Sequence, residues 1–138
     1  MTTPAEVVRG YLGAFEKGDP AAIAAFVTED FENEHLSELG SGCSGRTEYL
    51  NRLPGFLGTF TNQTYTVLDL VGSDQPRSTA TVVVRYRFDA VFEGTAIAIP
   101  GVMWFNISGG LIVRRTDIWD SLTFLNQTSQ SGNPSPNP

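Results

Sequence analysis

The order of two hydrophobic patterns constrains the fold of this chain more than any other feature. Up to residue 60, apolar residues recur mainly at helical spacing, whereas the later sequence is strand-like. The strand-like runs cover residues 64–71, 78–92, 95–107 and 111–125, and turn-forming sequences separate them. Helices followed by a series of strands that short turns can join predict an α+β domain with a mostly antiparallel sheet.

Helix-start signals predict where the first helices begin. Thr3 and Glu6 have the spacing of a capping box, and Pro4 stands at the first helical position. A helix of about four turns should therefore begin there. Gly18 is expected to end this helix, and Asp19 to cap a second one.

The following part of the chain predicts two further helices with a less regular segment between them. A short apolar helix is expected over residues 21–27, and residues 31–39 are expected to be extended or irregular. Residues 46–60 predict a third helix, in which Pro54 predicts a kink or a break. Three helices should therefore precede the strands.

The composition is that of one globular domain. The chain has 138 residues, of which 41% are hydrophobic and 17% charged, so residues 1–128 are expected to form a single domain. Residues 129–138 are rich in Ser, Asn and Pro and are predicted to be a disordered tail. The formal net charge of −6, with no basic run, argues against nucleic-acid binding.

Several function classes are excluded by what the sequence lacks. There is no apolar run of the roughly 18 residues that a membrane span needs, and the N-terminus does not have a signal-peptide pattern, so a cytoplasmic protein is expected. Cys43 is the only cysteine and His35 the only histidine, which excludes an internal disulfide, a cysteine zinc site and a two-histidine zinc site. We expect no metal and no cofactor, and Cys43 has no evident task.

Three charged residues stand out within the strand-like runs. Side-chain alternation puts Arg87 and Asp89 on one face of their strand, and Asp117 on a face with Arg115 and Trp119. If both runs belong to one curved sheet, one arginine could lie between two carboxylates. Such a group can keep one acid protonated and the other ionised, as general acid–base catalysis requires. The competing interpretation is a solvated ion pair worth roughly 0–1 kcal/mol, and the spacing alone favours it.

Short motifs join the expected elements in a recognisable order. The order begins with a helix, Gly-Asp-Pro at residues 18–20, a short helix and Thr-Glu-Asp-Phe at residues 28–31. A third helix, introduced by Gly-Arg, comes next, and four strands follow it. This order resembles the nuclear transport factor 2-like superfamily, and residues 110–127 are similar to its SnoaL-like branch. The resemblance covers roughly residues 5–127. It implies a cone in which three helices pack on a strongly curved, mostly antiparallel sheet around an internal pocket.

Limonene-epoxide hydrolases, on the same scaffold, provide the first comparison of site residues. That family has an Arg-x-Asp on one strand and an Asp on the last strand, which resemble Arg87, Asp89 and Asp117. The resemblance implies that Asp89 protonates the epoxide oxygen, that Asp117 activates water and that Arg87 bridges them. Two further water-holding positions, a Tyr and an Asn in that family, fall on Asn33 and His35, which departs from the family pattern.

Two other enzyme families give different assignments. The oxyanion tyrosine of ketosteroid isomerases falls on Tyr11 and their catalytic aspartate on His35, but their second oxyanion donor falls on Gly101, which cannot supply it. Polyketide cyclases of the SnoaL type close a ring by an aldol reaction with a last-strand aspartate and a nearby histidine, which resemble Asp117 and His35. An unperturbed histidine titrates near pH 6.5 and can act as base or donor at neutral pH.

Three hypotheses follow for the function. The leading one is a small cofactor-free enzyme that hydrolyses an epoxide of an apolar small molecule, with catalytic residues Arg87, Asp89, Asp117 and His35. The residues expected to contact the substrate are Tyr11, Asn33, Trp104 and Trp119. The second is a cyclase or isomerase that forms an enolate with His35 and Asp117. The third is a domain that only binds a ligand or a protein chain.

The aromatic face of residues 78–92 predicts a homodimer. Tyr86, Phe88 and Phe92 lie on the face opposite Arg87 and Asp89. If the charged face lines the pocket, the aromatic face needs another cover, because an exposed apolar patch of that size is unusual on a monomer. We therefore expect a dimer built on the outer face of the sheet.

Overall fold

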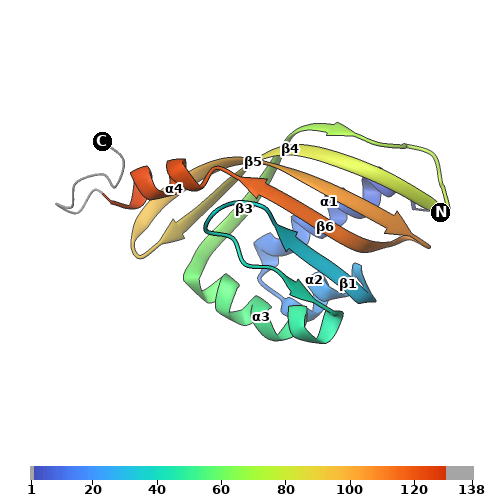
Figure 1. Ribbon diagram of the computed structural model, residues 1–138, viewed down its shortest axis with the longest axis horizontal. Coiled ribbons are helices and arrows are strands. Elements are labelled where there is room, and N and C mark those ends of the chain that lie inside the picture. The colour runs from blue at the N-terminus through green and yellow to red at the C-terminus, as the bar shows by residue number, and fades with distance from the viewer. Residues whose placement is uncertain (1, 130–138) are drawn as a thin grey trace.

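The computed structural model describes residues 2–129 and has the expected α+β class (Figure 1). Its helices are α1 (Pro4–Ala14), the 3₁₀ turn η1 (Phe15–Lys17), α2 (Pro20–Ala24), α3 (Arg46–Thr59) and α4 (Ser121–Thr128). Its strands are β1 (Val27–His35), β2 (Cys43–Ser44), β3 (Phe60–Val71), β4 (Thr79–Phe92), β5 (Thr95–Ser108) and β6 (Leu111–Trp119).

The strands form one six-stranded sheet in the order β2-β1-β6-β5-β4-β3. All neighbouring strands are antiparallel except β1 and β6, which are parallel. Figure 1 shows the helices α1, α2 and α3 on one side of the curved sheet. Helix α1 packs against β3, β4 and β6, whereas α3 contacts both β1 and β3, so α3 bridges parts of the sheet that lie far apart in the strand order.

Local signals set the helix boundaries as predicted. The Thr3 hydroxyl accepts a hydrogen bond from the Glu6 amide at 3.1 Å, and the Glu6 carboxylate accepts one from the Thr3 amide at 3.0 Å. Gly18 ends η1 with a φ of 66°, which an L side chain rarely adopts. Asp19 then caps α2 by accepting a hydrogen bond from the Ala21 amide at 3.0 Å.

Two element predictions were wrong around the second helix and in the third. The second helix ends at Ala24 and not at residue 27, and β1 already begins at Val27, before the segment of residues 31–39 that was expected to be extended or irregular. Strand β1 does not look like a buried strand, because Asn33 is among its inward-facing residues. Of the kink or break predicted at Pro54, the break is absent, since α3 is continuous from Arg46 to Thr59.

The last predicted strand is shorter than expected and continues as a helix. Strand β6 ends at Trp119, because Asp120 caps α4 by accepting a hydrogen bond from the Thr123 amide at 2.9 Å. The Gln127 side chain then pairs with both backbone groups of Ala98, accepting from its N–H at 2.8 Å and donating to its carbonyl at 2.9 Å. These two bonds hold α4 against β5.

The hydrophobic core decides which face of β4 points inward. The side chains of Tyr86 and Phe88 are buried with the core, whereas Arg87 and Asp89 point outward. The reason given for a homodimer was therefore wrong, because the aromatic face is covered by the chain itself. The outer face nevertheless exposes an apolar patch, the outer patch, formed by Val102, Trp104 and Ile118 on β5 and β6.

Two further expectations concern the C-terminal tail and the absence of a membrane-spanning segment. The predicted tail begins at Ser129, which follows α4 and is the last described residue, and residues 130–138 lie outside the described part of the chain. Within residues 2–129, no helix has both the length and the apolar character to cross a membrane.

Candidate active site

A cavity of about 590 Å³ opens between the sheet and α3. This volume falls within the roughly 300–1,000 Å³ range of small-molecule sites. Its walls are mainly apolar and come from η1, α3, β3, β4, β5, β6, α4 and the segment after β1. The apolar residues of the lining include Phe15, Leu39, Leu53, Phe56, Phe60, Phe88, Ile97, Ile99, Trp119 and Phe124.

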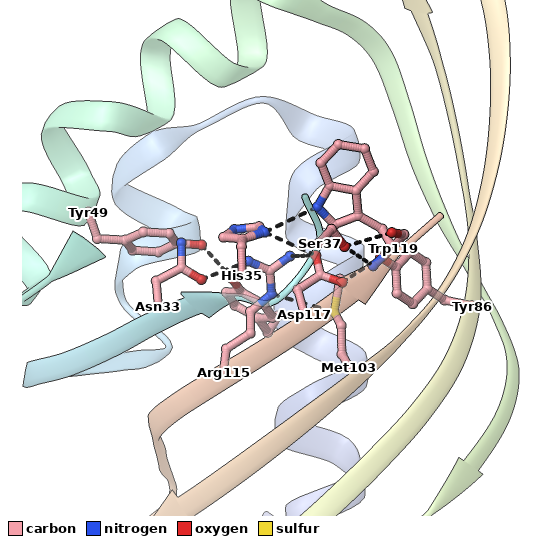
Figure 2. Close-up of polar contacts among 10 residues, drawn as sticks. Asn33, His35, Ser37, Tyr49, Tyr86, Met103, Arg115, Asp117 and Trp119 are labelled. Atoms are coloured by element: carbon pink, nitrogen blue, oxygen red, sulfur yellow. Dashed lines mark hydrogen bonds and ion pairs between the residues drawn. The ribbon is translucent and has the colours of Figure 1, made fainter. Parts of the chain in front are cut away.

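A buried ion pair on β6 forms the polar part of this cavity. Arg115 and Asp117 are two residues apart on one strand, so their side chains share a face. The Arg115 guanidinium donates to Oδ2 of Asp117 at 2.9 Å, and the two side chains are only 5% and 4% exposed. Tyr86 donates to the other carboxylate oxygen at 2.6 Å, and Arg115 also donates to the Asn33 side-chain carbonyl at 2.9 Å (Figure 2).

The parallel pairing of β1 with β6 supplies the remaining polar residues. In this register Asn33 is the partner of Arg115, and His35 is the partner of Asp117. Paired residues on neighbouring strands point to the same side of a sheet, so all four side chains meet. Two strands far apart in sequence therefore build one site.

His35 is a neutral hydrogen-bond donor in this arrangement. Its Nδ1 accepts a hydrogen bond at 3.3 Å from the indole N–H of Trp119, which can only donate, so the ring proton lies on Nε2. Burial, followed by the positive charges of Arg115 and Arg52, lowers the pKa of His35 to about 3. Nδ1 lies 3.9 Å from Oδ2 of Asp117, but a neutral imidazole does not form an ion pair there.

Burial raises the pKa of Asp117 above its ordinary value, although Arg115 and the Tyr86 hydrogen bond oppose the change. The carboxyl group therefore titrates closer to the neutral range in which a general base works best. Each carboxylate oxygen accepts one hydrogen bond from the protein and keeps a second acceptor position. Asp117 lines the cavity, so a substrate can approach one of these positions.

All four tyrosines of the chain surround the ion pair. The hydroxyls of Tyr11 and Tyr49 share a hydrogen bond, and the Arg115 guanidinium carbon lies 5.9 Å from the centroid of the Tyr11 ring. Tyr65 packs edge-on against Tyr86, with 5.4 Å between ring centroids. Burial raises the pKa of each of the four phenols, so they remain neutral at neutral pH.

Two glycines allow the site to close tightly. A Cβ atom at Gly101 would lie 2.5 Å from the Tyr86 hydroxyl, so a side chain there would displace the donor to Asp117. A Cβ atom at Gly40 would lie 2.5 Å from the Cβ of His35. The segment after β1 can therefore approach His35 only because residue 40 has no side chain.

The structure corrects the predicted triad. Arg87 and Asp89 form an ion pair at 2.8 Å on the outer face of the sheet, with side chains 49% and 39% exposed, so Arg87 does not lie between Asp89 and Asp117. The cation beside Asp117 is Arg115, which the sequence had placed on the correct face but left without a role. Arg115 and Asp117 repeat the Arg-x-Asp spacing of residues 87–89, and this repetition was the available signal.

The other predicted site residues divide into two groups. The cavity lining includes His35, Asn33 and Trp119, as expected. Tyr11 is fully buried and supports Arg115 from behind, and Trp104 is 49% exposed on the outer face, so neither lines the cavity. The lining residues that had not been predicted for the site include Tyr49, Tyr65, Arg52 and Arg115, and also Tyr86, which had been assigned to a dimer face.

The donor set of the described residues does not form a metal centre. Within residues 2–129, no group of three or more His, Cys, Asp or Glu side chains is arranged to hold a metal ion. Cys43 lies on β2 and is not part of the cavity lining, and burial raises the pKa of its thiol.

Comparison with known families gives an independent assignment of the fold. The family model described as SnoaL-like domain matches residues 8–115. The chain belongs to this family. A comparison of this SnoaL-like protein with curated proteins finds no match.

Solved structures agree with the assignment. A hypothetical protein from Catenulispora acidiphila with a ketosteroid isomerase-like fold, solved with trimethylamine, is 19% identical with a TM-score of 0.77, over 97% of each chain. A provisionally assigned polyketide cyclase from Xanthomonas campestris is 20% identical with a TM-score of 0.68, over 89% of this chain and 94% of its own. An LEH-like epoxide hydrolase from M. tuberculosis is 14% identical with a TM-score of 0.72, over 88% and 85%. At these identities the likeness concerns the fold alone.

Proposed function

We propose that this SnoaL-like protein is an enzyme that forms an enolate from a carbonyl group of an apolar small molecule and then cyclises or isomerises it. One observation carries the proposal. Asp117 is the one carboxylate among the described cavity-lining residues, and it is held by Arg115 and Tyr86 beside a neutral His35. A buried acid with a raised pKa, in a mainly apolar cavity, is a typical arrangement for a general base.

The proposed reaction begins with the carbonyl oxygen near Nε2 of His35, which carries the ring proton. Asp117 removes a proton from the adjacent carbon and becomes a carboxylic acid, while the enolate oxygen accepts a hydrogen bond from His35. A neutral donor in a cavity of low polarity can stabilise the developing negative charge without a proton transfer.

The second half of the reaction returns the proton. In cyclisation, the enolate carbon attacks a second carbonyl group of the same molecule, and the resulting alkoxide takes the proton from Asp117. In isomerisation, Asp117 gives the proton back to another carbon of a conjugated enolate. Either route restores the carboxylate, so Asp117 serves as base and then as acid.

Epoxide hydrolysis, the leading hypothesis from the sequence, receives less support from this geometry. That chemistry was expected to use two carboxylates on one arginine, one protonated and one ionised. Here the second arm of the buried arginine binds the amide oxygen of Asn33, and Asp89 lies on the outer face. A purely binding domain is also disfavoured, since the cavity is not filled by side chains and its acid is not exposed.

Deuterium exchange tests enolate formation without knowledge of the natural product. A panel of fused-ring ketones and 1,3-diketones is incubated with the protein in D₂O, and exchange at the α-carbon is followed by NMR. Asp117→Asn should slow the catalysed exchange by at least ~100-fold, because it removes the base. His35→Phe should slow it less, because it removes a donor but leaves the base.

Asp89→Asn is the matched control, since it makes the same chemical change on the outer face and should leave exchange unaltered. Equal exchange by wild type and Asp117→Asn would refute the assignment of the base. Hydrolysis of cyclic epoxides that Asp89→Asn abolishes would instead restore the hydrolase hypothesis.

A further inference from the structure

The cavity has a second polar region that the proposed reaction does not use. It is formed by Ser41, which follows β1, and by Asn51 and Arg52 on α3. The Arg52 guanidinium reaches from the helix to the Ser41 hydroxyl, to which it donates at 3.3 Å. The Arg52 side chain is 45% exposed, so this region lies where the cavity meets solvent.

The charge of the cavity is opposite to that of the whole chain. The chain has a formal net charge of −6, whereas the charged residues of the lining are two arginines and one aspartate. Arg115 is already paired with Asp117 inside the cavity. Arg52 is therefore the lining charge that no other lining residue balances.

The existing partner of Arg52 does not prevent it from binding a ligand. Glu48 accepts from Arg52 at 3.1 Å as an exposed i,i+4 pair on α3, and Glu48 does not line the cavity. Exposed pairs of this kind are weak, so a ligand anion can compete with Glu48. The charge of Arg52 also contributes to the lowered pKa of His35, for which burial and the charge of Arg115 are the larger causes.

We propose that Arg52 binds a carboxylate group of the substrate. The substrate would be an amphipathic molecule, with an apolar ring system against the aromatic walls and a carboxylate at the mouth beside Ser41. The planar guanidinium suits a carboxylate because it can donate two parallel hydrogen bonds. The inference rests on the proposed function only where it places a carbonyl group of the substrate near His35 and Asp117. Binding of the carboxylate depends on Arg52 and not on the reaction.

A pair of rigid probes tests the carboxylate site without turnover. 2-Naphthoate and its methyl ester share one apolar bicyclic body and differ in the charge, and their affinities can be measured by calorimetry or by quenching of tryptophan fluorescence. Wild type should bind the acid more tightly than the ester. Arg52→Gln should weaken binding of the acid about fivefold to tenfold and leave the ester unchanged, and the preference should shrink at high salt.

Two further variants separate a specific site from a general charge effect. Arg46→Gln removes an arginine from the same helix, one that pairs with Glu29 and does not line the cavity, so it should leave both affinities unchanged. Glu48→Gln removes the competing anion and should strengthen binding of the acid. Thermal melts verify that each variant is folded.

Equal affinity of wild type for the acid and the ester, or no binding of the acid at millimolar concentration, would overturn the inference. An equal loss for both probes in Arg52→Gln would also overturn it, because it would indicate damage to the cavity. These binding measurements involve no catalysis, so their outcome is independent of the deuterium-exchange test. The carboxylate site can be refuted while exchange still depends on Asp117, and it can be supported when exchange does not depend on Asp117.

Discussion

Replacing Arg115 by methionine is expected to destabilise the protein by about 3–5 kcal/mol at neutral pH, the range for a buried ion pair that loses one partner. The structure places Arg115 in this class, because it lies 2.9 Å from Asp117 and both side chains are at most 5% exposed. Methionine fills a similar space but leaves the carboxylate without a cation. For a domain of this size, 1 kcal/mol corresponds to roughly 3–4 °C, so the melting temperature should fall by about 9–20 °C.

The loss should depend on pH in a defined direction. Burial already raises the pKa of Asp117 in the wild type, and removal of the cation should raise it further. A group whose pKa is higher in the folded than in the unfolded state contributes stability at low pH that is lost as the pH rises. The deficit of Arg115→Met should therefore grow with pH above the wild-type pKa of Asp117, by at most about 1.4 kcal/mol per pH unit, and level off above the pKa of the variant.

Urea unfolding followed by circular dichroism between pH 5 and pH 8 measures this dependence. Arg87→Met is the matched control, since Arg87 has the same Arg-x-Asp spacing and a 2.8 Å ion pair, but an exposed one. It should cost less than about 1 kcal/mol at every pH. If Arg115→Met lost no more stability than Arg87→Met, or lost the same amount at all pH values, the argument from burial would be refuted.

Three further predictions concern other parts of the molecule. Gly101→Ala should displace the Tyr86 hydroxyl and destabilise the protein by roughly 1–3 kcal/mol, which a thermal melt would detect; an unchanged melt would contradict the contact. Because the pKa of His35 falls to about 3 in the folded state, wild type should lose stability relative to His35→Gln as the pH falls below roughly 6.5, and parallel pH profiles of unfolding would argue against this. The outer patch should support a homodimer that Trp104→Arg weakens, and light scattering that gives a 15.0 kDa wild-type particle would exclude it.

The structure explains why alternation along β4 was predicted correctly but oriented wrongly. The sequence separated Arg87 and Asp89 from Tyr86 and Phe88, as found, but the charged face was assigned to the pocket. Burial of a large apolar side chain stabilises a fold by roughly 1.5–3 kcal/mol, and the buried face of β4 has several such side chains. An exposed ion pair contributes roughly 0–1 kcal/mol. Hydrophobic burial therefore decides which face is inside, and the similarity of Arg87 and Asp89 to a catalytic motif has no weight in that balance.

Strand β1 shows why the residue pattern alone could not place Asn33 and His35 in the site, where only the family resemblance predicted them. The strand is short of apolar residues, since only Val27 and Phe31 among its buried positions are hydrophobic, and Asn33 and His35 take inward positions that a core strand would fill with aliphatic side chains. The proposed function accounts for the departure, because it requires polar residues that point into the cavity. A pattern of this kind is typical of an irregular segment when it is considered without its partner strand.

The register between β1 and β6 is the feature on which the whole site depends. A shift by one residue would turn Asn33 and His35 to the outer face and separate them from Arg115 and Asp117. The contacts that oppose such a shift join residues some 82 positions apart, beyond the reach of any local sequence pattern. Beyond His35, the Ser37 hydroxyl donates to the Trp119 carbonyl and accepts from its amide, both at 2.6 Å. This side chain therefore pairs with both backbone groups of Trp119, as the backbone of a neighbouring strand would.

The outward side of the same strands fixes the register a second time. Glu34 forms an ion pair with Arg114 at 2.9 Å and accepts a hydrogen bond from Thr116 at 2.8 Å, so it lies between two alternate residues of β6. These contacts are exposed or half-buried and each is weak, yet a slip of one residue would break both together with the inner set. The inner and outer contacts therefore support the same register, and His35 lies beside Asp117 because the polar contacts on both faces of β1 require that register.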